Sequence, residues 1–95
     1  MYMTLKNEET KKLFDAILAL KTHDDCSKFF EDICTIKELQ SMAQRLEVAD
    51  LLTKKKTFSE IVAATGASTA TISRVNKCLM YGPGGYSLVL DSDKN

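Results

Sequence analysis

The chain lacks most of what enzymes, secreted proteins and membrane proteins require. It has one histidine and shows no nucleophile elbow and no phosphate-binding glycine motif, so few routes to catalysis remain. No apolar run approaches the roughly 20 residues that cross a bilayer. The first residues also lack the apolar stretch of a secretory signal. We therefore expect a cytoplasmic protein that is not an enzyme and enters no membrane.

Cysteine is scarce and shows no pairing pattern. Cys26, Cys34 and Cys78 are odd in number and form no C-x-x-C motif, so we interpret them as small buried hydrophobes in a reducing compartment. His23 and Cys26 flank two aspartates, but one histidine adjacent in sequence to the other groups gives poor convergence on zinc. Such a cluster more often consists of acidic residues that stabilise a helix N-terminus than of metal ligands. We predict no metal site and no cofactor.

Net charge is also absent, yet the charges are unevenly distributed. The 13 basic and 13 acidic residues cancel, so total charge does not indicate a nucleic-acid partner. Residues 1–52 hold 7 basic and 10 acidic residues, whereas residues 53–81 hold 5 basic residues and 1 acidic residue. A positive field concentrated in residues 53–81 is what attraction to phosphates requires.

The composition, 44% hydrophobic and 27% charged, is that of one globular domain. Within residues 1–55, side chains that cap helices recur at intervals. They predict three helices, the last ending near Lys55, and the capping residues are Asn7 with Glu8 and Glu9, Thr22 or Asp24, and Thr35 with Glu38.

The third of these helices carries more apolar surface than one neighbour needs. One side holds Leu39, Met42, Ala43, Leu46 and Ala49, and another holds Val48, Leu51 and Leu52. A domain of this size has a limited core, so burial of the extra face against a second copy is a natural remedy. We expect residues 1–55 to form the dimerisation helices.

Residues 57–80 predict a helix-turn-helix. Thr57 with Glu60 forms a capping box, Gly66 is placed to end the first helix in a left-handed conformation, and Ser68 can cap a second helix. The second helix of such a motif is shaped to enter the major groove of DNA. Its buried stripe would consist of Ile72, Val75 and Leu79.

The other face of that second helix has the chemistry for contact with DNA. Small side chains allow close approach to base edges, hydroxyls bond to bases or phosphates, and cations pair with phosphates or guanine. We predict a DNA-binding set of Ser68, Thr69 and Ala70 near bases, Thr71, Ser73, Arg74 and Lys77 near phosphates or bases, and Lys54, Lys55 and Lys56 beside them.

Two alternatives stay open for these residues. The hydroxyl groups could solvate a helix that docks into a partner protein, which would make the chain a protein-interaction module without DNA binding. The three consecutive lysines could equally be a solvated helix end, because cations favour a helix C-terminus.

Residues 81–95 form a glycine-rich tail. Proline and glycine at positions 82–85 interrupt any helix, and their spacing is not that of a phosphate-binding loop. We expect a flexible exit from the second helix. Residues 86–90 fit either a short strand or a last helical turn.

Two segments of this chain, EDICTIKELQSMAQRLEVADLL and, after it, ATGASTATISRVNKCL, carry a specific pattern. They resemble the tryptophan repressor family, in particular its small bacterial branch with an ASTATISRVN core and a YGPGGY tail, and the similarity spans about residues 5–81. The turn glycine, the spacing and the A-T-I-S-R run agree together. The resemblance implies an all-α, intertwined homodimer that binds two-fold symmetric operator DNA and represses transcription.

The resemblance also implies a candidate effector pocket. Tryptophan-sensing members hold the amino acid with two arginines. Arg74 matches the first, and Arg45 lies near the second, because the segment between Arg45 and the motif is one residue shorter here. Val75 stands where those members have a glycine that makes room for the indole ring. An isopropyl group there would overpack the site at a cost of about 1–3 kcal/mol. We hypothesise that the protein does not sense tryptophan and that any effector is a different small molecule.

Overall fold

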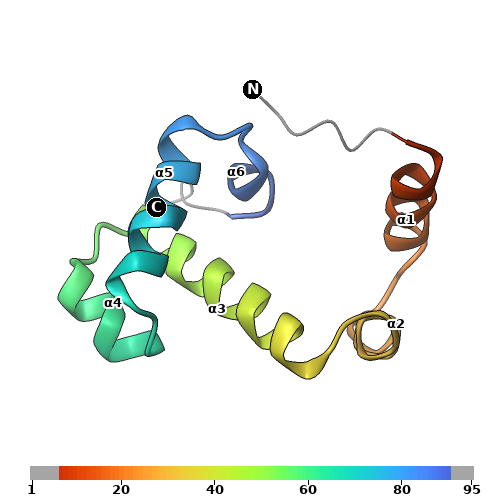
Figure 1. Cartoon of the computed structure of the whole chain (residues 1–95), viewed down its shortest axis with the longest axis horizontal. Coiled ribbons are helices and arrows are strands. Elements are labelled where there is room, and N and C mark those ends of the chain that lie inside the picture. Colours follow the sequence, from red (N-terminus) through yellow and green to blue (C-terminus); the bar gives the residue numbers. More distant parts are fainter. Residues whose placement is uncertain (1–6, 91–95) are drawn as a thin grey trace. The chain divides into compact units, whose positions relative to one another are not determined.

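The computed structural model describes residues 7–90, and over that range all the regular secondary structure is helical (Figure 1). The expected all-α fold is thereby confirmed. The described residues divide into two compact units within the third helix, residues 7–39 and residues 40–90, and each is described by itself. The described elements are α1 (Glu8–Leu18), α2 (His23–Ile33), α3 (Ile36–Thr53), α4 (Phe58–Thr65), α5 (Thr69–Tyr81) and α6 (Gly85–Val89).

In the first unit, side-chain caps start α1 and α2. The Asn7 side chain accepts a hydrogen bond from the Thr10 backbone N–H at 2.8 Å, and Thr22 Oγ1 accepts one from the Asp25 N–H at 3.0 Å. Of the two candidates for the second start, the cap is therefore Thr22, because its hydroxyl satisfies a donor of the first turn. Neither α1 nor α2 contains a buried residue.

A reciprocal capping box opens α3, as the sequence predicts. Thr35 Oγ1 accepts from the Glu38 N–H at 3.1 Å, and Glu38 Oε1 accepts from the Thr35 N–H at 2.8 Å. The helix ends at Thr53, so its predicted extension to about Lys55 is wrong. Lys55 has φ 66°, a left-handed conformation that no residue inside an α-helix adopts.

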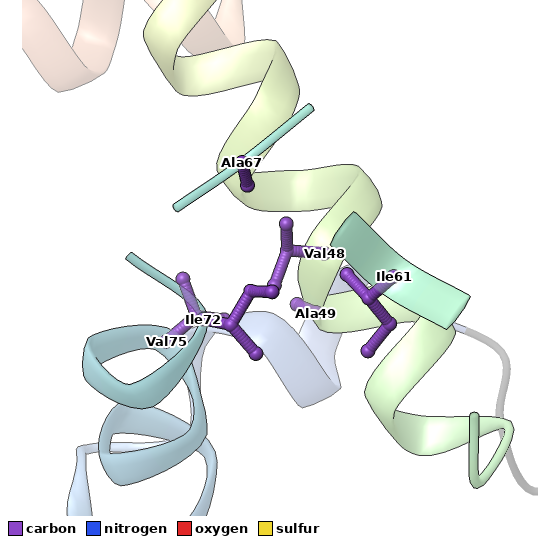
Figure 2. Close-up of a cluster of buried hydrophobic side chains, with 6 residues drawn as sticks. All are labelled: Val48, Ala49, Ile61, Ala67, Ile72 and Val75. Atoms are coloured by element: carbon purple, nitrogen blue, oxygen red, sulfur yellow. The ribbon is translucent and has the colours of Figure 1, made fainter. Parts of the chain in front are cut away.

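The core of the second unit lies among α3, α4 and α5. Its side chains point toward one another from three helices and from the turn after α4 (Figure 2). Leu79 packs against this cluster while staying partly exposed, so the predicted stripe of α5 is confirmed. The buried members are Val48, Ala49, Ile61, Ala67, Ile72 and Val75.

The glycine-rich segment leads into a further short helix, α6. Gly84, at φ 91°, precedes it in a left-handed conformation that suits glycine. Tyr86 and Leu90 lie four positions apart and both pack against the core cluster. The prediction of a flexible exit is therefore wrong for residues 85–90, and the choice between strand and helix falls to helix. Positions 91–95 lie outside the described residues. No helix within residues 7–90 is both long and apolar enough to span a bilayer.

Candidate nucleic-acid interface

The local signals predicted for the helix-turn-helix are all present. The capping box at the start of α4 joins Thr57 and Glu60 through bonds of 2.8 and 3.1 Å. The backbone bond from the Thr57 N–H, the bond from the Thr57 side chain and the charge of Lys56 hold the pKa of the Glu60 carboxyl below its usual 4.5, against a smaller opposing effect of desolvation. Gly66 ends α4 with φ 73°. These groups set the direction in which the chain enters α5.

Ser68 begins α5, and its hydroxyl is used within the helix. Its Oγ accepts from the Thr71 N–H at 3.1 Å and donates to Thr71 Oγ1 at 3.1 Å. Ser68 therefore caps α5 by satisfying a backbone donor of its first turn.

The outward face of α5 consists of small and basic side chains. Ile72 and Val75 are turned inward, at 0% and 1% exposure. The predicted contact residues Thr69, Ala70, Ser73, Arg74 and Lys77 are exposed, and Thr71 is half-buried at the edge of the face. Small residues at the start of the helix allow its backbone to approach a groove, and the two cations farther along can reach phosphates.

The three lysines before α4 are exposed but not equivalent. Lys54 forms an ion pair with Asp50, with 2.9 Å between Lys54 Nζ and Asp50 Oδ2, and this hydrogen bond and charge raise the pKa of Lys54 above 10.5. Lys55 occupies the left-handed turn that ends α3. Asp50 already partly neutralises the charge of Lys54. The charges of Lys55 and Lys56 are therefore better placed to attract phosphate.

The three residues of the predicted effector pocket differ in their exposure and in the helices that carry them. Val75 is a member of the core, Arg74 is exposed on α5, and Arg45 lies on α3, where its Nη1 donates to Ser41 Oγ at 2.8 Å. Arg45 does line a cavity of about 450 Å³ in the second unit. The other lining residues are Met42, Leu46, Cys78, Pro83, Gly85, Tyr86 and Val89.

The acidic cluster that resembles a metal site serves the start of α2. Asp24 pairs with Lys28 at 3.1 Å, and the Asp25 carboxylate accepts from the Lys21 N–H at 3.2 Å. No group of three potential metal ligands lies together within residues 7–90.

Sequence reasoning missed two residues that shape this region. Ala67, directly after the turn glycine, is 3% exposed and packs into the core (Figure 2). Gln44 Nε2 donates to the Thr65 carbonyl at 3.2 Å, across 21 positions of sequence. The position of Ala67 between Gly66 and Ser68 was a usable signal, because a small apolar residue suits a tight turn above a core. No local pattern marks Gln44.

Two capped helices joined through a left-handed glycine, the second with a slim polar face and nearby cations, define a helix-turn-helix DNA-binding regulator. The sequence model described as "Trp repressor protein" matches residues 8–94. The chain belongs to the Trp repressor family, as its motifs predict. This is a family of DNA-binding regulators and not of enzymes.

Relatives and solved structures agree with this assignment. The uncharacterized protein YerC of Bacillus subtilis (strain 168) is 52% identical over 90 residues, which cover 95% of this chain and 86% of YerC. A TrpR-like protein from Eubacterium eligens ATCC 27750 is 53% identical, with a TM-score of 0.88 over 90% of this chain and 88% of its own. A candidate Trp repressor from Staphylococcus aureus is 42% identical, with a TM-score of 0.91 over 98% of this chain and 96% of its own. The Trp-repressor type of fold is thereby confirmed.

Proposed function

We propose that the protein is a transcriptional repressor that binds two-fold symmetric operator DNA as an intertwined homodimer. The observation that carries the proposal is the face of α5. Ile72 and Val75 anchor the helix in the core, while Thr69, Ala70 and Arg74 stay exposed on its other side. A helix held in this way and exposed along a narrow polar edge matches the needs of the major groove.

The N-terminal helices support the dimeric part of the proposal. α1 and α2 have 11 residues each and bury none, and Phe14 and Ile33 are both 52% exposed. Helices this short are marginal in water without tertiary packing of an apolar face. A second copy that interlocks with these helices would supply the packing, as the family resemblance implies. Two α5 helices in one dimer would contact half-sites about one turn apart, roughly 10 bp from centre to centre.

Val75 supports independence from tryptophan. Its side chain is 1% exposed and belongs to the core, so its isopropyl group occupies volume that a glycine at this position would leave free. Titration calorimetry of the purified protein with tryptophan should show no saturable binding. Tight saturable binding would refute this part of the proposal and leave the DNA-binding part intact.

Selection from random duplex oligonucleotides with the purified full chain tests the main proposal. We expect a two-fold symmetric site, and affinity that falls steeply with salt, by about 0.9 log unit per log unit of salt for each phosphate neutralised. Arg74→Ala removes one cation from each subunit, so the slope should decrease by up to about 2. Lys12→Ala, an exposed cation on α1, is the matched control and should leave the slope unchanged.

A different outcome would favour the protein-interaction module. If no duplex is enriched, and if Arg74→Ala abolishes binding to a protein partner with a shallow salt dependence, the repressor proposal fails.

A further inference from the structure

One polar contact ties α3 to the turn between α4 and α5. Among residues 7–90, the bond from Gln44 Nε2 to the Thr65 carbonyl, at 3.2 Å, is the only side-chain hydrogen bond between positions more than four apart. Side-chain bonds elsewhere in this range connect neighbours on one helix or its cap, such as Lys11 with Asp15. The contact is half-buried, so water competes with it less than at an open surface.

Thr65, the acceptor, is the centre of the turn. Its Oγ1 donates to the Ile61 carbonyl at 2.7 Å and accepts from the Ala67 N–H at 3.1 Å. Its own carbonyl is one of the last four of α4, which have no partner within the helix. Gln44 supplies the missing donor and restrains the peptide group directly before Gly66, whose φ of 73° redirects the chain.

The position of Gln44 on α3 gives this contact a rigid support. Gln44 and Val48 are four residues apart and therefore share one face of the helix. Val48 is fully buried against the core that holds Ile72 of α5 and Ala67 of the turn (Figure 2). The Gln44 amide thus extends this packed face by one helical turn, to the point where α4 ends and three residues before the Ser68 cap of α5.

We propose that Gln44 is a positioning residue for DNA recognition: its amide sets the direction of α5 by holding the Thr65 carbonyl. This inference rests on the proposed function. Without the bond, the turn gains freedom, and α5 spends a smaller fraction of time in the orientation that fits a half-site. Apparent affinity falls in proportion to that fraction. Non-specific binding depends chiefly on phosphate attraction and therefore changes little.

The test compares affinities of the full-length protein for a selected operator duplex and for a shuffled duplex at one salt concentration. Gln44→Met keeps the length of the side chain and removes the donor. Gln44→Lys restores a donor beside a helix C-terminus, where a cation is favourable. Gln40→Met is the matched control, because Gln40 is exposed one turn earlier on the same helix.

Loss of one intramolecular hydrogen bond changes an equilibrium constant by a few-fold. If each subunit loses about threefold in the fraction of time that α5 is correctly oriented, the ratio of operator affinity to shuffled-duplex affinity should fall about tenfold in a Gln44→Met dimer. Affinity for the shuffled duplex should stay within about twofold of wild type. Gln44→Lys should recover most of that ratio, and Gln40→Met should equal wild type. A merely structural role would lower the melting temperature without separating the two affinities.

The outcomes distinguish the two proposals. If wild type shows no preference for any duplex, the proposed function fails. If wild type prefers its operator and Gln44→Met keeps the full ratio, the inference about Gln44 is overturned. It is also overturned if Gln44→Met loses affinity equally for both duplexes.

Discussion

Val75 offers a sharp test of how α5 is held, because its burial is nearly complete. Val75→Ala removes two methyl groups from a side chain that is 1% exposed. Transfer of those methyls accounts for about 1.6 kcal/mol at roughly 0.8 kcal/mol each. The remaining cavity adds roughly 1 kcal/mol, and the better helix propensity of alanine returns about 0.5 kcal/mol. We expect a loss of about 2 kcal/mol per subunit in the free energy of unfolding.

Urea denaturation followed by circular dichroism would measure this loss. All variants must be compared at one protein concentration, because the stability of a dimer depends on concentration. Val62→Ala is the matched control: the same atoms are removed from α4, at a side chain that is 37% exposed, and the loss should stay below about 1 kcal/mol. If Val75→Ala costs no more than Val62→Ala, the assignment of Val75 to the core is refuted, and with it the argument against a tryptophan site.

Three further predictions concern the caps and the turn. Ser68→Ala removes the acceptor for the Thr71 N–H and should cost about 1 kcal/mol in urea denaturation; an unchanged midpoint would contradict the cap. Gly66→Ala should lower the free energy of unfolding by about 1–2 kcal/mol, and Gly66→Asn should lower it less. An added Cβ meets no atom within 4 Å, so only the left-handed φ is penalised. Equal losses in the two variants would argue against backbone strain. Because the pKa of Glu60 is lowered, its carboxylate stabilises the fold at pH values above the ordinary pKa of 4.5. This contribution is lost as the pH falls through the lowered pKa. Glu60→Gln should therefore destabilise the protein relative to wild type at pH 6 and approach it below pH 4.5, and a constant difference across that range would exclude the carboxylate as the cause.

Local signals in the sequence predicted the helix-turn-helix closely. Thr57 with Glu60, Gly66 and Ser68 each act within three or four residues, where capping and φ preferences outweigh distant contacts. Family membership followed from the same segment, because spacing and residue types agree there together. The DNA-contact set and the effector residues stay predictions.

The two errors have different causes: a tertiary contact outweighed a local rule in one, and a helix end carried no signal in its residue types in the other. Proline and glycines at positions 82–85 indicated a flexible exit, yet residues 85–89 form α6, and Tyr86 and the C-cap residue Leu90 both pack against the core. The end of α3 was placed two residues late, because the lysines of positions 54–56 are compatible with helix and only the left-handed Lys55 shows that the helix has ended.

The sequence by itself determined that helices form before residue 82, where α1, α3, α4 and α5 begin and which stripe of α5 turns inward, because caps and apolar periodicity act over one or two turns. Only the tertiary structure decided that Ala67 would be buried and that Gln44 would reach Thr65 across 21 positions. Those outcomes depend on how α3, α4 and α5 pack together. Contacts between positions far apart in the sequence produce no repeating residue pattern from which they could be predicted.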